Sequence, residues 1–270
     1  MSHGPGDGNS LRELLGALAA GDLDVEGALQ RLRLFQVSQL GDFARLDSGR
    51  ILRKGVPEVV YAPRKTDNQL EAIVRHFVEA RGLALVSRLE AARADLLRSK
   101  LESEGGYEGL GFDYDPEAAV LAVTTTSYRP PEPRGYIGLL TAGTSDIPVA
   151  EEAALVAEHM GCHVERGYDV GVAGVHRLLE PLSRMIEAGA DVFVVAAGME
   201  GALPSVVGGL VDVPVIGVPT STGYGMGGDG TAALCSILQS CSPGVVAVNI
   251  DNGVGAGAAA ALIARRHTTD

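Results

Sequence analysis

A cysteine with a distinctive local setting lies near the end of the chain, in the segment Ser240-Cys241-Ser242-Pro243-Gly244. An apolar run from Val245 to Ile250 follows at once, and then the polar turn Asp251-Asn252-Gly253. The pattern predicts that Cys241 lies in a loop between a helix and a strand, where a thiol can act as a nucleophile. A helix C-terminus disfavours a thiolate, so other groups would have to activate it. Taken alone, the local sequence favours an inert loop cysteine over a catalytic one.

The other two of the three cysteines are predicted to be core residues. Cys162 begins a predicted strand, and Cys235 lies within an apolar helix. The odd number and the lack of metal-ligand spacing argue against a disulfide framework, which predicts a cytoplasmic protein in a reducing compartment. His159 and His163 are four residues apart, but Gly161 should end the helix between them, so no metal pair is expected.

A second group of polar residues lies in the turn Thr141-Ala142-Gly143-Thr144-Ser145-Asp146, directly after an apolar run. The turn leads into a helix N-terminus, where free amides and the helix dipole bind phosphate or carboxylate. The alternative is that Ser145 or Asp146 only caps the helix, and both roles can hold together.

Three more glycine-rich turns follow later apolar runs. The first contains Gly198, Met199 and Glu200, with Pro204 in the first turn of a helix. The second, from Pro219 to Gly230, has five glycines in twelve residues and is typical either of a mobile loop that closes over a ligand or of a surface connection. In the third, Asp251 and Asn252 either position polar atoms near the thiol or cap the final helix.

These turns are predicted to share one edge of a parallel sheet. Short apolar runs alternate with helical segments after residue 135, and runs rich in Val, Ile and Leu are typical of strands that are buried on both faces. The pattern predicts a doubly wound α/β fold of the flavodoxin or Rossmann type, with the site at the carboxyl ends of the strands. The five predicted strands are Tyr136–Thr141, His163–Tyr168, Val192–Ala197, Val213–Val218 and Val245–Ile250.

The five predicted helices that accompany these strands are Val149–Met160, His176–Ala188, Leu203–Leu210, Thr231–Ser240 and Ala256–Arg266. The last of them is rich in Gly and Ala, and its segment 256–264 is expected to permit close helix packing at a subunit interface.

The first half of the chain predicts a smaller α+β domain. Ser10 and Asp24 each begin a helix of a helical hairpin, and Thr66 caps a helix that buries Leu70, Ile73, Val74, Phe77 and Val78. The other predicted elements are a short strand over 59–61, strands over 83–89 and 118–125, and a helix over 90–101. We divide the chain into residues 1–126, a proline-rich linker over 127–134, and an α/β catalytic domain over 135–270.

Composition excludes several classes of function. The chain of 270 residues has a net charge of −12, which leaves no basic surplus for binding nucleic acid. No apolar run approaches the roughly 20 residues that a membrane helix needs, and the first ten residues carry no apolar signal region.

The motifs of the second half resemble the AIR carboxylase (PurE) superfamily: the turn Gly143-Thr144-Ser145-Asp146, the pair Leu203-Pro204, and Gly217-Val218-Pro219. PurE enzymes carry a catalytic histidine directly before the Leu-Pro pair, and this chain has Ala202 there.

Nearly the whole chain is similar to the LarB family. The N-terminal motif is Asp47-x-x-Arg50-x-x-Arg53-x-Gly55-x-Pro57-Glu58-Val59 with Lys65-Thr66. The C-terminal motifs are the segments 141–146 and 198–204, the loop that ends at Asp229-Gly230, Ser240-Cys241, and Asn249-Ile250-Asp251-Asn252-Gly253.

The LarB resemblance implies an enzyme of nickel-pincer cofactor synthesis. Its dinucleotide substrate would be nicotinic acid adenine dinucleotide, which it would carboxylate on the pyridinium ring with CO2 or bicarbonate. It would also cleave the phosphoanhydride, giving pyridinium-3,5-biscarboxylate mononucleotide and AMP. A divalent ion such as Mg2+ would assist, with Asp146, Glu200 and Asp251 as candidate ligands and no spacing that defines a metal site. PurE-like folds assemble as octamers with shared sites, so a homo-oligomer is expected.

The resemblance also assigns roles to residues. Cys241 is the nucleophile that adds to the pyridinium ring. Thr144, Ser145 and Asp146 hold the phosphate–ribose part, and Gly198, Met199 and Glu200 line the ring pocket. Arg50, Arg53 and Lys65 bind substrate carboxylates or phosphates, or else form surface salt bridges with Asp47 and Glu58.

Two other functions compete with this one. A PurE-type carboxylase or mutase would act on aminoimidazole ribonucleotide, and Ala202 argues against it. A non-catalytic sensor would bind the dinucleotide and use the glycine-rich loops as a switch.

Overall fold

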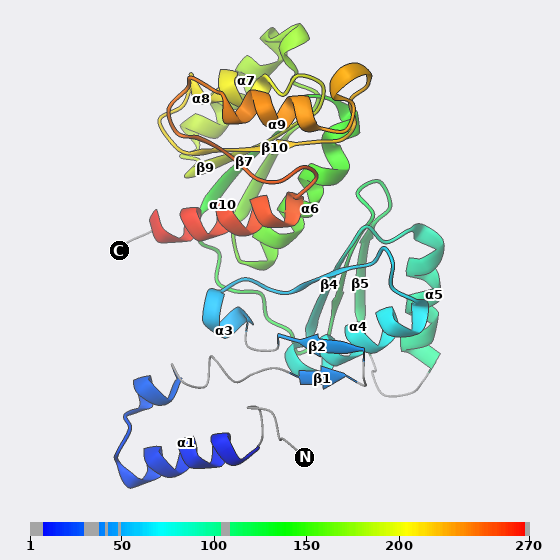
Figure 1. Ribbon diagram of the computed structural model, residues 1–270, viewed down its shortest axis with the longest axis vertical. Helices are drawn as coiled ribbons and strands as arrows, with labels where there is room; N and C mark the ends of the chain where they lie inside the picture. The colour runs from blue at the N-terminus through cyan, green and yellow to red at the C-terminus, as the bar shows by residue number, and fades with distance from the viewer. Residues whose placement is uncertain (1–7, 30–37, 41–42, 48–49, 104–108, 268–270) are drawn as a thin grey trace.

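The computed structural model describes residues 8–29, 38–40, 43–47, 50–103 and 109–267. Within these ranges the chain forms two α/β units, each built around its own sheet, and a two-stranded ribbon (Figure 1). No helix among the described residues is both long and apolar enough to cross a membrane.

The C-terminal unit contains a five-stranded, all-parallel sheet, which confirms the predicted fold class. The strand order β11-β10-β9-β7-β8 is that of the flavodoxin type of doubly wound sheet. The last strand ends at Ala247, earlier than the predicted Ile250, because the chain turns there and Asp251 N donates to Pro219 O at 2.9 Å. The strands are β7 (Tyr136–Thr141), β8 (His163–Gly167), β9 (Val192–Ala197), β10 (Val215–Pro219) and β11 (Val245–Ala247).

Helices cover both faces of this sheet (Figure 1). Consecutive strand residues such as Val194 and Val195 point to opposite faces of the sheet, and each is buried in an apolar core. This explains the continuous apolar runs in the sequence. Helices α6 (Ile147–His159) and α10 (Gly253–His267) pack on one face. The other face carries α7 (His176–Glu187), α8 (Leu203–Gly208) and α9 (Thr231–Leu238).

The small residues of α10 allow this helix to pack closely against α6 of the same chain. A Cβ added at Gly253 would lie 2.0 Å from Val149 O, and one added at Gly257 would lie 2.2 Å from Ala153 O. Helices α10 and α6 therefore pack backbone to backbone. The predicted use of segment 256–264 at a subunit interface stays a prediction.

The N-terminal unit has a mixed four-stranded sheet in the order β3-β4-β6-β5, in which only β3 and β4 pair in parallel. Its helix α4 (Asp67–Arg81) begins with the predicted cap Thr66, which forms a capping box with Gln69, and it buries the five predicted apolar residues. The other elements are β3 (Val59–Tyr61), β4 (Leu83–Ser87), α5 (Ala91–Ser103), β5 (Gly111–Asp115) and β6 (Val120–Thr124).

Some elements of the first half differ from the predictions. Helix α1 (Gly8–Ala20) starts before Ser10, so this serine does not begin it. Residues 25–29 are helical as predicted, and Asp24 Oδ1 accepts a bond from Gly27 N at 2.7 Å, whereas Leu32 lies outside the described residues. The ribbon of β1 (Ser38–Leu40) and β2 (Ala44–Leu46), helix α3 (Arg50–Lys54) and strand β5 were not predicted.

Residues 125–135 contain no helix or strand and lead from one sheet to the other. They lie against the C-terminal unit, since Arg134 N donates to Gly161 O at 2.6 Å. The domain boundaries that the sequence suggested stay a prediction.

Candidate active site

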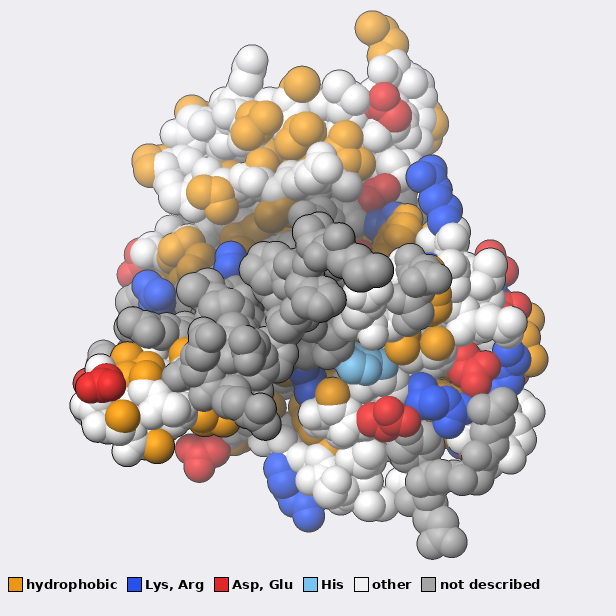
Figure 2. All heavy atoms as spheres, turned by 60° about the horizontal axis from the view of Figure 1, so that its bottom comes forward, with side chains coloured by type: hydrophobic (Ala, Val, Ile, Leu, Met, Phe, Trp, Pro, Cys, Tyr) orange, Lys and Arg blue, Asp and Glu red, His pale blue; other side chains and the backbone are white. Residues whose placement is uncertain are grey.

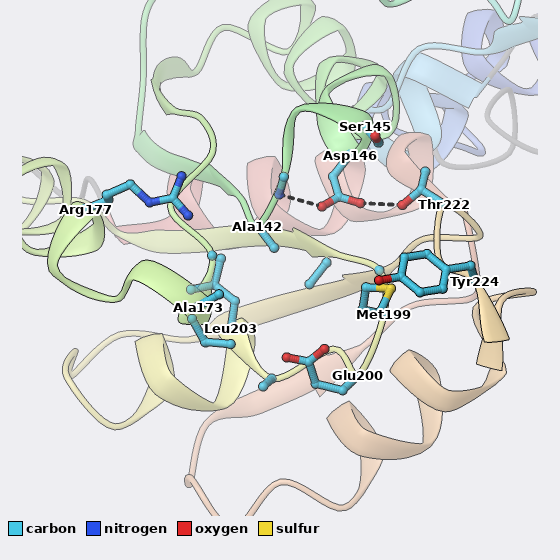
Figure 3. A pocket seen from close by; sticks show the side chains of 16 residues that line it. Ala142, Ser145, Asp146, Ala173, Arg177, Met199, Glu200, Leu203, Thr222 and Tyr224 are labelled. Carbon is cyan, nitrogen blue, oxygen red and sulfur yellow. Dashed lines mark hydrogen bonds between the residues drawn. The ribbon is translucent and has the colours of Figure 1, made fainter. Parts of the chain in front are cut away.

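A cavity of about 330 Å³ opens at the carboxyl ends of β7 and β9 (Figure 3). The chain leaves β7 toward β8 on one side and leaves β9 toward β10 on the other, so the cavity lies at the switch point where such sheets bind ligands. Its lining residues follow four different strands. They are Ala142, Gly143, Ser145, Asp146, Gly171, Val172, Ala173, Arg177, Ala197, Gly198, Met199, Glu200, Ala202, Leu203, Thr222 and Tyr224.

Asp146 ties two walls of this pocket together. Its carboxylate is buried, and Oδ2 accepts a bond from Gly143 N at 2.8 Å. Oδ1 accepts from the hydroxyl of Thr220 at 2.6 Å and from that of Thr222 at 2.8 Å, the latter drawn in Figure 3. The buried charge is thus satisfied by three donors of the protein. Asp146 therefore holds the turn after β7 to the loop after β10, and it does not cap α6.

The neighbours of Asp146 in the predicted phosphate turn are exposed. Ser145 lines the pocket, and Thr144 begins the short 3-10 turn beside it. The side chain of Ser145 is thus available to an anionic ligand, while Asp146 shapes the turn. The amide of Ile147, the first residue of α6, donates to Thr144 O instead, and Pro148 has no amide hydrogen.

Gly198 allows this network to form. A Cβ at this position would lie 2.6 Å from Thr222 Oγ1 and 2.8 Å from Thr220 Oγ1, so any larger residue would displace the threonines. Met199 follows with φ +49°, a left-handed conformation that is uncommon outside glycine, and both Met199 and Glu200 are exposed at the pocket.

The glycine-rich loop over 220–230 is held at its base and exposed at its tip. Thr220 and Thr222 are bonded to Asp146, whereas the side chain of Tyr224 is 80% exposed and Met226 is fully exposed. At the far end, Gly230 has φ +88° and a Cβ there would lie 2.7 Å from Ile250 Cγ2. Only the middle of the loop is free to close over a ligand.

The sequence analysis missed Arg177, the only Lys or Arg among the described residues that line the pocket. It lies in the first turn of α7, where Nη1 donates to Asp169 Oδ2 at 2.5 Å and Nε donates to Gly174 O at 3.4 Å. Arg177 could have been predicted from the sequence, because a basic residue at the start of a helix that follows a parallel strand lies close to the carboxyl ends of the strands, where ligands bind.

The three predicted basic residues of the N-terminal half do not line this pocket. Arg50 lies 3.5 Å from Asp47 in an ion pair, and Lys65 Nζ donates to Tyr61 O at 2.9 Å. Arg53 belongs to α3, but its side chain lies outside the described residues. Arg50 thus forms the salt bridge with Asp47 that the sequence analysis gave as the alternative to substrate binding.

Asp251 and Asn252 also lie outside the pocket lining. Asn252 Oδ1 accepts a bond from Gly255 N at 2.9 Å, so this residue caps α10. The carboxylate of Asp251 accepts bonds from Ser221 N at 2.8 Å and Ser221 Oγ at 2.6 Å. Asp251 therefore holds the base of the glycine-rich loop.

Cys241 is exposed in the loop between α9 and β11, at the edge of the sheet where the strands begin. Its neighbours are fixed to α8, because Ser205 Oγ donates to Ser240 Oγ at 2.8 Å and Ser242 Oγ donates to Ser205 O at 2.7 Å. The pocket lies at the opposite edge, and Cys241 does not line it. The structure thus keeps this thiol away from the pocket of its own subunit.

The other two cysteines differ from each other. Cys162 is buried as predicted, and burial raises the pKa of its thiol to about 11. Cys235 was predicted to be a core residue but is exposed, because α9 turns Ala233 and Ile237 to the core instead.

We expect Cys162 to be the slowest of the three thiols to react with iodoacetamide in the native protein at pH 8. With a pKa of about 11, only roughly one Cys162 thiol in 1,000 is ionised at this pH, and it is also shielded. Peptide mass spectrometry after timed alkylation measures the order, and labelling in denaturant is the control. Alkylation of Cys162 as fast as that of Cys235 would contradict the burial seen here.

The described side chains do not form a metal site, since no group of three or more His, Cys, Asp or Glu among them could hold an ion. Of the three predicted ligands, Asp146 and Asp251 already bind donors of the protein, whereas Glu200 lines the pocket and has no hydrogen bond or ion pair with another described residue. Mg2+ prefers one or two carboxylates together with phosphates of the substrate. The described side chains do not by themselves provide such a set of Mg2+ ligands.

Comparisons with known proteins divide the chain into two matched regions. A family model described as "AIR carboxylase" matches residues 136–270, and one described as "LarB/PurE-like N-terminal domain" matches residues 37–125. An uncharacterised protein of Methanocaldococcus jannaschii is 42% identical over 261 residues, which cover 96% of this chain and 98% of that protein.

Two further similar proteins match less than half of the chain. N5-carboxyaminoimidazole ribonucleotide mutase of Thermotoga maritima is 34% identical over 134 residues, 47% of this chain and 73% of that enzyme. The mutase of Methanocaldococcus jannaschii is 35% identical over 120 residues, 43% of this chain and 71% of that enzyme. The N-terminal match therefore distinguishes this chain from these mutases.

Proposed function

Because this chain belongs to the LarB family, with its PurE-like carboxylase domain, we propose that it carboxylates the pyridinium ring of nicotinic acid adenine dinucleotide. In the same proposal it cleaves the phosphoanhydride of the dinucleotide. CO2 or bicarbonate is the second substrate, and pyridinium-3,5-biscarboxylate mononucleotide and AMP are the products. The route is that of nickel-pincer cofactor synthesis.

The observation that carries the proposal is Ala202 at the start of α8. It lines the pocket directly before Leu203-Pro204, where PurE enzymes have their catalytic histidine. No histidine is among the described residues that line the pocket. The described pocket therefore lacks the histidine that the PurE reaction needs. A pyridinium substrate does not need it in the proposed reaction, because its electrophilic ring can be attacked by a thiolate.

A thiolate makes that ring reactive toward CO2. The Cys241 sulfur adds to a ring carbon, the ring electrons neutralise the pyridinium nitrogen, and the adjacent enamine carbon becomes nucleophilic. This carbon forms a bond to CO2, a base removes its proton, and the thiolate leaves as the aromatic ring returns. A hydroxyl is a poorer leaving group, which favours cysteine over serine.

The pocket fits the anionic half of such a substrate. Ser145 and the amides after Gly143 would bind the phosphate–ribose part, and Arg177 lies across the pocket from them (Figure 3). Gly198, Met199 and Glu200 would border the ring. Roles in substrate binding for Thr144, Arg50, Arg53, Lys65, Asp251 and Asn252 stay predictions.

The position of Cys241 leads us to propose that a neighbouring subunit supplies the thiol. The loop is surrounded by exposed apolar side chains, since Leu238 is 67%, Val246 53% and Leu210 51% exposed. Figure 2 shows orange side chains spread over the C-terminal unit with few charges between them. Such a surface is typical of protein interfaces. A homo-oligomer, an octamer by analogy with PurE, would bring Cys241 to the pocket of another copy.

Mg2+ remains part of the proposal as an ion that would arrive with the phosphates of the substrate. No step above depends on it, because the described side chains do not fit a metal site of their own.

Mass spectrometry tests the proposed reaction. The purified protein is incubated with nicotinic acid adenine dinucleotide, ¹³C-bicarbonate and Mg2+. The expected products are AMP and a mononucleotide that carries one added, labelled carboxylate. Unlabelled nicotinic acid mononucleotide as the sole mononucleotide product would reduce the function to hydrolysis, and no turnover would overturn it.

Replacing Arg177 by glutamine should weaken binding of the dinucleotide by about 10- to 100-fold, because a charge-assisted hydrogen bond contributes roughly 1.5–3 kcal/mol. Calorimetric titration with the dinucleotide measures the change. Arg184→Gln is the matched control, since Arg184 lies on the same helix in exposed ion pairs and does not line the pocket. Equal affinity in Arg177→Gln and wild type would remove Arg177 from the site.

A PurE-type mutase is the second candidate, favoured by the 33–35% identity of the C-terminal region to N5-carboxyaminoimidazole ribonucleotide mutases. Incubation with that ribonucleotide tests it, and turnover that is lost in Ser145→Ala would replace our proposal. A sensor would bind the dinucleotide and release no AMP.

A further inference from the structure

Arg88 joins the two units of the chain. It follows β4 of the N-terminal sheet, and its Nε donates to the buried Glu152 of α6 at 2.9 Å. Its Nη2 donates to Asp251 O at 2.6 Å, and its guanidinium lies 5.5 Å from the centre of the Tyr61 ring. One side chain thus binds α6 and the turn before α10 at the same time.

Both ends of the Arg88–Asp251 bond have an unusual backbone. Arg88 has φ +54° and Asp251 has φ +55°, in the left-handed region that residues other than glycine seldom occupy. Such conformations persist where the surroundings hold them in place. Here each residue is held by bonds to the opposite unit or to the loop beside the pocket.

Asp251 carries the connection from Arg88 to the pocket. Its carbonyl accepts the bond from Arg88, and its carboxylate accepts two bonds from Ser221. Ser221 lies between Thr220 and Thr222, which both donate to Asp146 in the pocket wall. Hydrogen bonds on either side of the backbone segment 220–222 therefore connect the N-terminal unit, through the base of the glycine-rich loop, to the pocket.

We propose that Arg88 is a positioning residue, through which the N-terminal unit holds the base of the loop over 220–230 in the geometry that binds substrate. Arg88 does not line the pocket, so it acts through Asp251 and Ser221. The inference deepens the proposed function, because it takes this pocket as the substrate site. In this proposal the N-terminal unit contributes to substrate binding in the pocket of the C-terminal unit.

Hydrogen exchange tests the connection without any substrate. In Arg88→Met we expect amides of residues 219–224 to exchange at least about tenfold faster than in wild type, because Asp251 loses its anchor and the Ser221 amide loses a fixed acceptor. Arg98→Met is the matched control. Arg98 has an ion pair of 3.2 Å with Glu102 and lies 5.1 Å from the Phe112 ring centre, but it has no bond to the C-terminal unit in the described structure. Unchanged exchange in Arg88→Met, or equal changes in both variants, would overturn the proposal.

Kinetics provides the second readout. In Arg88→Met, KM for nicotinic acid adenine dinucleotide should rise about tenfold while kcat stays within twofold, because the loop shapes binding and no proposed chemical step uses a residue of the loop. Arg88→Lys should recover part of the affinity, since one ammonium replaces one of the two bonds. A fall in kcat with unchanged KM would contradict this role. If wild type does not turn over the dinucleotide, the proposed function fails, and the exchange result still decides the role of Arg88.

A double variant controls for the possibility that Arg88→Met fails to fold. Burial raises the pKa of the Glu152 carboxyl, and loss of Arg88 would leave this buried acid without its cation. Arg88→Met with Glu152→Gln removes both charges and should fold, as thermal unfolding will show. It should repeat the faster exchange of residues 219–224, and exchange like that of wild type would overturn the proposal.

Discussion

Replacing Cys241 by alanine should abolish carboxylation of the dinucleotide, with a loss of at least about 10³-fold, as is usual when a covalent nucleophile is removed. Without the sulfur the pyridinium ring remains an electrophile and offers no carbon that can attack CO2. Cys241 is exposed and does not line the pocket of its own subunit, so the dinucleotide should still bind within about threefold of wild type. Release of labelled mononucleotide and calorimetric binding measure the two effects.

Cys235→Ala is the control for this experiment. Cys235 is also exposed and lies six residues earlier on α9, and the proposed chemistry gives it no role. It should retain full activity. A Cys241→Ala protein that still forms the carboxylated product would disprove the nucleophile, whereas loss of binding in the same variant would mean that Cys241 only supports the fold of its loop. Cys241→Ser should resemble the alanine variant, because an alkoxide leaves the ring far less readily than a thiolate.

Local rules made much of the fold predictable. The helix cap at Thr66 and the apolar spacing along α4 depend on residues a few positions apart, and both match the sequence prediction. The three inner strands β7, β9 and β10 were recognisable because nearly all of their residues are buried, with an apolar core on each face of the sheet. The C-terminal fold class follows from these runs and from the short turns between them.

The missed elements depend on partners that are distant in sequence. Strand β5 has Gly111 and two aspartates and no residue that is fully buried, and it is a strand because β6 pairs with it. Helix α9 was predicted, but it is apolar nearly all round, so the sequence could not indicate that Cys235 faces outward. Long-range pairing and the choice of helix face are decided by tertiary packing.

The candidate site likewise contains features that local sequence patterns predict and features that depend on tertiary packing. The turns at Gly143 and Gly198 were placed at the pocket because strand order and handedness bring the carboxyl ends together. The bond from Arg88 to Asp251 joins residues 163 positions apart, and no local pattern announces it. Arg50 and Lys65 were instead favoured by a motif, and the structure does not bring them to this pocket.

The distance between Cys241 and the pocket has a structural cause. In a parallel sheet with right-handed crossovers, a loop that precedes a strand and a turn that follows one lie at opposite edges. Cys241 precedes β11, whereas the pocket turns follow β7 and β9. Movement of a side chain cannot bridge the sheet. If Cys241 is the nucleophile, a second copy of the chain must present it, and two inactive variants can then complement each other.

We therefore expect activity to return when Cys241→Ala and Arg177→Glu subunits are assembled into one oligomer. The first variant keeps its pocket, and the second keeps its thiol but repels the anionic substrate. With random assembly, half of the pockets are intact and half of the donated thiols are present, so about a quarter of the sites should work. Co-expression with two different tags and tandem purification isolates the hybrids, and each variant purified alone is the control. If the thiol acts within its own subunit, no site in the hybrid combines an intact pocket with a cysteine, and activity will not exceed the sum of the two inactive proteins.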